Sequence, residues 1–131
     1  MVIDTSGVIA ILREEPSATA VKECLEYADS MVMSAATRVE LTAVLRRTLD
    51  PVAQSRAERV LRGYNISIVD FTAAQAAIAD RAFKDFGQGS GHPARLNFGD
   101  CFSYALATSL DEPLLFVGDD FSKTDVVPAL A

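Results

Sequence analysis

The sequence contains few of the residues that form disulfide frameworks or zinc sites. Only two of its 131 residues are cysteine and one is histidine. Cys24 and Cys101 are too few for a disulfide framework and lack the spacing of a metal-binding pair. His92 lies alone in a glycine-rich stretch, which excludes a zinc site or a catalytic base assembled from histidines. We therefore expect both cysteines to be reduced residues of the core.

Long apolar runs are also missing. None approaches the roughly 18 residues that a membrane-spanning helix needs. The first residues carry neither the basic segment nor the cleavage-type ending of a signal peptide, and Asp4 interrupts the first apolar run. We therefore expect a cytoplasmic protein that has no contact with a membrane.

Positive charge is scarce as well. Lysine and arginine together number 12 against 18 aspartates and glutamates, which gives a net charge of −6. This balance argues against broad electrostatic binding to nucleic acid. It does not exclude an enzyme that acts on nucleic acid, because acidic residues gathered at one metal site lower the net charge without covering the rim around it.

The residues that are present have the composition of one compact domain, with 50% hydrophobic and 23% charged residues. Short β-rich runs alternate with longer helical patterns. We expect strands at residues 2–3, 31–33, 66–69 and 114–117, with a short fifth strand at 126–127, and helices at 6–13, 17–27, 35–49, 51–64, 73–86 and 97–110. Ser17 is the expected N-cap of the second helix. The alternation predicts an α/β fold, a three-layer α/β/α sandwich around a central, mainly parallel sheet of about four or five strands.

Acidic residues follow the predicted strands or open the predicted helices. Asp4 ends the first strand, and Asp119 and Asp120 directly follow the fourth. Glu40 lies early in the helix after the second strand, and Asp100 lies in the first turn of its own helix. Each of them also has a structural explanation, as a helix cap or a solvent-facing charge. Their combination favours one shared site, because parallel α/β sheets bind ligands outside the carboxyl ends of their strands.

A cluster of ionised carboxylates needs compensation. Two unit charges ~4 Å apart repel by roughly 4 kcal/mol at an effective dielectric constant near 20. Such a cluster therefore either raises the pKa of some members or holds a cation. Ligands that offer oxygen only favour Mg²⁺ or Mn²⁺ over zinc. The chemistry that we expect is metal-assisted hydrolysis of a phosphodiester.

Four stretches of the sequence resemble a known family. They are MVIDTS, TRVEL, LNFGDCFSYALA and PLLFVGDDFSKTDV, and they are similar to the four acidic motifs of PIN-domain ribonucleases. More closely, they resemble the VapC toxins of bacterial type II toxin–antitoxin pairs, over a span from Val2 to Val127. The resemblance implies a single PIN domain over residues 1–131 with a PIN-like sandwich fold. It implies Mg²⁺-dependent cleavage of RNA, with Mn²⁺ as an alternative ion, by a metal-activated water.

Carried over motif by motif, the resemblance places the acidic quartet at Asp4, Glu40, Asp100 and Asp120, as catalytic residues and metal ligands. Asp119 remains a candidate helper. Two residues with small hydroxyl side chains also belong to these motifs. The resemblance implies that Ser6 hydrogen-bonds a ligand or water and that Thr124 supports Asp120. Capping of a helix or turn explains both hydroxyls equally well.

The resemblance also implies partners. We expect RNA to contact Arg38, His92 and Arg95 on the rim, and a small VapB-type antitoxin to cover the active site. A homodimer is implied, and a heterotetramer or larger assembly with the antitoxin. Two other interpretations are open: a PIN-like module kept only for partner binding, and a Mg²⁺-dependent phosphotransfer protein. The second fits poorly, because Ser6 occupies the position where the dehalogenase type requires a second aspartate.

Overall fold

A small parallel sheet forms the middle layer of the molecule. The computed structural model describes residues 1–130, and within them four strands pair in the order β3-β2-β1-β4: Val2–Ile3 (β1), Val32–Ser34 (β2), Ser67–Val69 (β3) and Leu114–Leu115 (β4). All the pairings between these strands are parallel. β1 is therefore a central strand, with β2 and β4 on either side of it.

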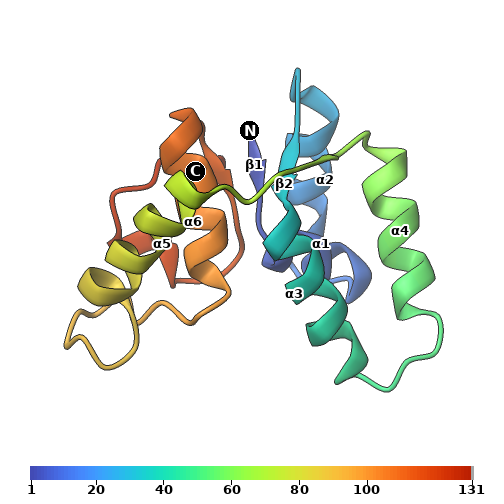
Figure 1. Cartoon of the computed structure of the whole chain (residues 1–131). Coiled ribbons are helices and arrows are strands. Elements are labelled where there is room, and N and C mark those ends of the chain that lie inside the picture. The colour runs from blue at the N-terminus through green and yellow to red at the C-terminus, as the bar shows by residue number, and fades with distance from the viewer. Residues whose placement is uncertain (131) are drawn as a thin grey trace.

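Helices cover both faces of this sheet. Over the same residues they are Thr5–Leu12 (α1), Ala18–Tyr27 (α2), Ala35–Arg46 (α3), Ala53–Gly63 (α4), Ala73–Phe86 (α5) and Asp100–Leu110 (α6), with a 3₁₀ turn at Phe121–Lys123 (η1). Figure 1 shows α5 and α6 on one side of the sheet and α1 to α4 on the other. The three-layer α/β/α arrangement predicted from the sequence is confirmed. No helix of residues 1–130 is long and apolar enough to cross a membrane.

The central strands are apolar on both faces because each face is covered by helices. Ile3 packs into the cluster formed with α1 to α4, whereas its neighbour Val2 packs into the cluster formed with α5 and α6. Leu115 and Leu114 divide in the same way between the two clusters. None of the four side chains is more than 1% exposed. Burial of each stabilises the fold by about 1.5–3 kcal/mol, so this two-residue alternation anchors β1 and β4 firmly.

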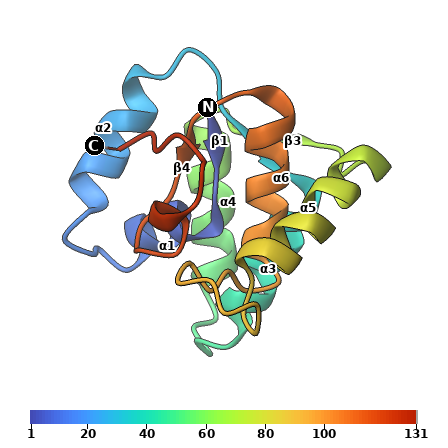
Figure 2. The same ribbon diagram turned by 90° about the vertical axis from the view of Figure 1, so that its left-hand side faces the viewer.

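Polar side chains fix the helices that begin at the carboxyl end of the sheet. The carboxylate of Asp4 accepts the N–H of Ser6 at 2.9 Å and so caps α1. At the start of α6 the bonds are reciprocal: the side chain of Asn97 accepts the N–H of Asp100, and the carboxylate of Asp100 accepts the N–H of Asn97, each at 2.9 Å. β1 runs downward from the N-terminus in Figure 2 and leads into α1 at the lower rim of the sheet.

Some helix boundaries differ from the prediction. The last helix begins at Asp100 rather than at residue 97, because the Asn97 side chain closes its first turn from outside. Ser17 occupies the N-cap position of α2 as predicted, but its backbone angles are helical and its side chain makes no capping bond. α3 ends at Arg46 rather than at residue 49, where Leu49 adopts a positive φ of 54°.

The predicted fifth strand is reduced to a single bridge. Leu114 pairs in parallel with Pro128, outside any named strand. The N–H of Leu114 donates to the carbonyl of Val127 at 2.8 Å, and the N–H of Ala129 donates to the carbonyl of Leu114 at 2.9 Å. Pro128 has no N–H of its own to continue the pairing. β4 is likewise shorter than predicted and ends at Leu115.

Candidate active site

Asp4 is held firmly at the carboxyl end of the central strand. Its side chain is only 3% exposed. Oδ2 accepts the backbone N–H of Ser6 at 2.9 Å and the hydroxyl of Ser6 at 2.6 Å, and Oδ1 accepts the hydroxyl of Ser103 at 2.6 Å. The N–H of Asp4 donates to the carbonyl of Leu115 at 3.0 Å, which extends the pairing of β1 with β4. Asp4 is thus a helix cap and a fixed site carboxylate at once.

Glu40 reaches toward the other acids from the second turn of α3. Its Oε1 accepts the hydroxyl of Thr5 at 2.6 Å. Its other oxygen lies directly against Gly99, where an added Cβ would be 1.0 Å from Oε2. Burial raises the pKa of Glu40, and the charge of Asp4 raises it further, while the bond from Thr5 and the charge of Arg47 lower it. Gly99 is therefore the residue that leaves room for this carboxylate.

Asp100 is buried at the start of α6, with an exposed fraction of 7%. Burial raises its pKa to about 7, although the hydrogen bond from the N–H of Asn97 opposes this. The negative charges of Asp4, Asp120 and Glu40 raise the pKa further. Asp100 therefore lies within electrostatic reach of the other three acids of the predicted quartet.

Asp119 and Asp120 are both exposed on the turn that follows β4. The charge of Asp120 acts on Asp100. The backbone carbonyl of Asp119 accepts the hydroxyl of Ser122 at 2.6 Å. Of the two carboxylates, that of Asp120 is the one whose charge acts on Asp100.

The two predicted supporting hydroxyls differ in their contacts. Ser6 donates to Asp4 and accepts the N–H of Val117 at 3.1 Å, so its hydroxyl is engaged with a site acid. Thr124 donates its hydroxyl to the carbonyl of Phe121 at 2.7 Å, which closes η1. The predicted support of Asp120 by Thr124 is therefore not seen; Thr124 acts as a turn cap.

The donor set suits a hard divalent cation. It consists of carboxylate oxygens, which match Mg²⁺ or Mn²⁺. Among residues 1–130, none of the four acids takes part in an ion pair with lysine or arginine. Among the same residues, no three acidic, histidine or cysteine side chains are already grouped closely enough to hold an ion. The residues thus fit such an ion in their chemistry, and no direct ion pair occupies their oxygens.

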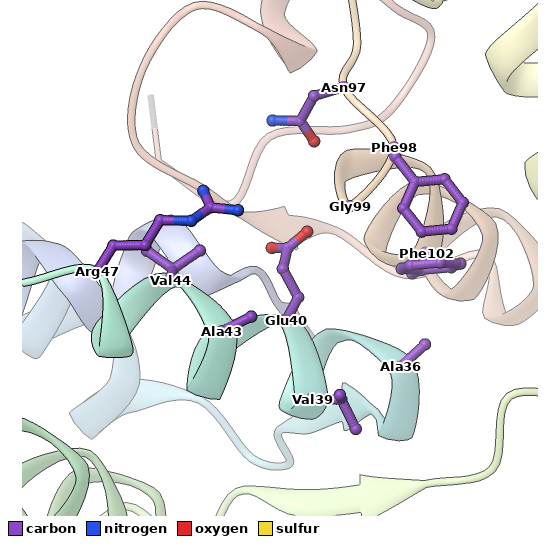
Figure 3. Close-up of a pocket in the computed structure, with 10 residues that line it drawn as sticks. All are labelled: Ala36, Val39, Glu40, Ala43, Val44, Arg47, Asn97, Phe98, Gly99 and Phe102. Carbon is purple, nitrogen blue, oxygen red and sulfur yellow. The ribbon is translucent and has the colours of Figure 1, made fainter.

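A pocket of about 710 Å³ opens between α3 and the start of α6. Figure 3 shows Glu40 pointing into it between Ala43 and the Gly99 backbone. Its walls are mainly apolar: Ala36, Val39, Ala43, Val44, Phe98 and Phe102. Arg47 contributes a guanidinium at one end. The candidate acidic site is therefore bordered by the mainly apolar walls of this pocket.

The comparisons with known proteins identify the family. A family model of the PIN domain matches residues 1–127. The chain belongs to the PIN-domain family. Ribonuclease VapC42 of Mycobacterium tuberculosis is 47% identical over 129 residues, which cover 98% of each chain.

Solved structures agree on the fold of this PIN domain. M. tuberculosis VapC20, described as a sarcin–ricin loop cleaving toxin, matches with a TM-score of 0.75 at 16% identity, over 99% of this chain and 98% of its own. VapBC2 of Rickettsia felis, bound to a fragment of promoter DNA, matches with a TM-score of 0.71 at 13% identity, over 97% and 94%. The predicted fold is thus confirmed. The predicted enzyme class is confirmed by the curated relatives, and the chain is a PIN-domain ribonuclease of the VapC type.

One predicted basic residue is turned away from the site of this PIN domain. Arg38 pairs with Glu58 of α4 and donates to the hydroxyl of Thr42 at 2.9 Å. Residues two apart on a helix do not share a face, so Arg38 faces α4 while Glu40 faces the pocket. Arg47 lies seven residues, or two turns, beyond Glu40 and does share its face. The helical spacing therefore separates Arg47, which lies on the side of Glu40, from Arg38, which does not.

The other two predicted RNA contacts lie on the loop before α6. The ring of His92 packs edge-on against Phe86 with centroids 4.9 Å apart, and its Nδ1 accepts the N–H of Ala94 at 3.1 Å. His92 therefore helps to shape the loop. Arg95 is exposed, with a positive φ of 50°.

Sequence reasoning missed three residues of the candidate site. Ser103 follows Asp100 by three residues and so shares its face of α6, which was a usable signal. Thr5 directly follows Asp4, but its contact with Glu40 depends on how α1 and α3 pack. The need for glycine at position 99 likewise depends on tertiary structure, because its backbone angles are helical and open to any residue.

Replacing Gly99 by alanine is expected to displace the Glu40 carboxylate while the fold survives. The helical φ of −67° and ψ of −36° at this position suit alanine, and the atoms that must move are the end of a flexible side chain. We expect ribonuclease activity to fall at least about tenfold with a melting temperature within about 4 °C of wild type. Gly63→Ala is the matched control, because no atom lies within 4 Å of a Cβ added there. Equal activity of both variants would contradict this account of Gly99.

The metal-free protein is expected to lose stability as pH rises. The pKa of Asp100 is raised from 3.8 to about 7 in the folded chain. The unfolded chain releases this proton at lower pH, so deprotonation between these values favours unfolding. In Asp100→Asn, the fall in the free energy of unfolding between about pH 4 and pH 8 should shrink, by on the order of 3 kcal/mol. Urea titrations in a chelator would measure this, with the exposed Asp29→Asn as control. An unchanged pH dependence in Asp100→Asn would refute it.

Proposed function

We propose that this PIN-domain protein is the toxin of a type II toxin–antitoxin pair and cleaves RNA phosphodiester bonds internally with the help of Mg²⁺. Mn²⁺ serves as an alternative ion. The catalytic and metal-binding residues are Asp4, Glu40, Asp100 and Asp120, with Asp119 as a helper. The names of the curated relatives support the ribonuclease activity.

One observation carries the assignment of the site. Burial, together with the charges of the other three acids, brings the pKa of Asp100 to about 7. The supports of Asp4 and Glu40 are neutral hydroxyl groups, from Ser6, Ser103 and Thr5. Neutral donors orient a carboxylate without cancelling its charge, which leaves a strong demand for a cation at this place.

The residues divide the work of hydrolysis. These carboxylates would hold a divalent ion, which would make a water more acidic and stabilise negative charge on the phosphate. Asp4 and Asp100 are the first candidates to hold it, since both are nearly buried and fixed by hydrogen bonds. Glu40, turned inward by Thr5, and Asp120, on the exposed turn, either complete the ion's shell or orient the attacking water.

Substrate contact involves the basic groups that remain free near the site. Arg47 lines the pocket beside Glu40, and Arg95 is exposed on the loop before α6. Both suit phosphates of an RNA chain. Arg38 is less suited, because its guanidinium already pairs with Glu58.

The proposed partners follow from the relatives. A toxin–antitoxin complex from Klebsiella pneumoniae and VapBC2 of R. felis share the fold of this chain. They support a VapB-type antitoxin as the partner that neutralises the ribonuclease. We further propose that the pair acts in the cytoplasm. We extend this to a toxin homodimer and to a heterotetramer or larger complex with the antitoxin.

Cleavage should depend on the divalent ion and on two of the acids. Wild-type protein, purified free of antitoxin, is expected to cut structured RNA with Mg²⁺ or Mn²⁺ and to stop in a chelator. Asp4→Asn and Asp100→Asn should each lower the rate by more than about 100-fold, since losing even an indirect support of a metal site typically costs 10- to 100-fold. Gel-based cleavage assays would measure this, with Asp29→Asn as control.

Two results would oppose the proposal in different ways. If wild type cuts none of a panel of tRNA, rRNA and mRNA with either ion, nuclease function fails for those substrates and a purely partner-binding module is favoured. If Asp4→Asn and Asp100→Asn cut as fast as wild type, the active site has been assigned to the wrong residues.

Replacing Arg38 of α3 and replacing Arg47, the residue that directly follows α3, should affect cleavage kinetics differently. Arg47→Ala is expected to raise KM for RNA roughly tenfold, because a phosphate contact is lost. Arg38→Ala should leave KM within about twofold and change stability by no more than about 1 kcal/mol, as expected for a partly exposed ion pair. Steady-state cleavage at fixed ionic strength would test this. An Arg38 effect on KM as large as that of Arg47 would show that both arginines contact RNA.

A further inference from the structure

Three elements that carry acids are linked by hydroxyl groups. Ser103, on α6, donates to Asp4 at 2.6 Å, and its oxygen lies 3.2 Å from the hydroxyl of Thr37 on α3. Thr5, on α1, donates to Glu40 on α3 at 2.6 Å. Thr37 and Glu40 are one helical turn apart, and Thr5 directly follows Asp4. The contacts therefore close a ring through α1, α3 and α6.

The direction of these hydrogen bonds can be assigned. A carboxylate accepts only, so the single hydrogen of the Ser103 hydroxyl is used on Asp4. At the contact between Ser103 and Thr37, the hydrogen must then come from Thr37. Ser103 and Thr37 are each 0% exposed, and Thr5 is 4% exposed. Water therefore cannot easily replace these donors, and a donor chain of this kind is strengthened by its own polarisation.

The ring consists of neutral donors only. Lysine or arginine in the same places would bind Asp4 and Glu40 equally well but would cancel the charge that attracts a cation. Hydroxyls fix the orientation of each carboxylate and leave its charge and remaining lone pairs for another ligand. The ring also joins the helix of Glu40 to the helix of Asp100, so the relative placement of the acids depends on it.

We propose that Thr5, Ser103 and Thr37 are positioning residues that hold Asp4 and Glu40 in a fixed orientation for a divalent cation. This inference rests on the metal-dependent function proposed above and names the residues that prepare the site. They need not touch RNA. Their loss should therefore weaken metal binding and lower kcat, while KM for RNA stays unchanged.

Isosteric variants separate the hydroxyl from its packing. Thr5→Val keeps the shape of the side chain and removes the donor, whereas Thr5→Ser keeps the donor. Ser103→Ala removes the donor to Asp4, and Ser109→Ala is its control on the same helix, because Ser109 donates only to the carbonyl of Leu106. The measurement is calorimetric titration of Mn²⁺ into each protein without RNA, followed by kcat and KM for cleavage.

We expect Thr5→Val and Ser103→Ala to bind Mn²⁺ about tenfold more weakly and to lose kcat at constant KM. Thr5→Ser and Ser109→Ala should bind as wild type does. If Ser103→Ala does not fold, the comparison of Thr5→Val with Thr5→Ser decides alone.

The inference is overturned if Thr5→Val binds Mn²⁺ as tightly as wild type, or if Thr5→Ser loses as much affinity as Thr5→Val. In either case a normal wild-type titration leaves the proposed function standing. If wild type itself binds no Mn²⁺ and cuts no RNA, the proposed function fails together with this inference.

Discussion

The mutual repulsion of carboxylates is the constraint around which this small protein is organised. Asp4 and Asp100 are almost fully buried, and Glu40 is partly buried. Burial raises the pKa of Asp100 to about 7, and the charges of the other three acids add to this rise. A fold that only had to be stable would replace such residues by apolar ones. Here the electrostatic cost of the carboxylates is confined to one rim of the sheet. Burial of the strands and of the helix faces that cover them offsets this cost elsewhere in the fold.

The fold meets this constraint with very short elements. β1 and β4 are each two residues long, yet each sends one side chain into the core on either side. The next residue after β1 is already Asp4. The short strand therefore fixes the position of Asp4. The backbone of Asp4 is paired to Leu115, and its side chain caps α1. Asp4 thus extends the strand pairing with its backbone, and its carboxylate both caps α1 and contributes to the candidate active site.

Much of this could be predicted from the sequence, because it depends on local patterns. The order of strands and helices follows from hydrophobic periodicity, and the common rim of the acids follows from parallel topology. The side chains that surround the acids depend on tertiary packing instead. Arg38 lies only two residues from Glu40 in the sequence but pairs with Glu58 of α4, because the face of the helix decides which residues meet. Gly99 has ordinary helical angles, so only the approach of Glu40 explains why it must be glycine.

The bridge between Leu114 and the segment around Pro128 has a consequence for aggregation. In a four-stranded sheet of order β3-β2-β1-β4, both outer strands could recruit a strand from another molecule. Val127 and Ala129 already occupy the backbone groups of Leu114. A further chain approaching from that side meets a proline, which has no N–H to offer. Growth of the described sheet by edge-to-edge pairing is therefore restricted to β3, which is only three residues long.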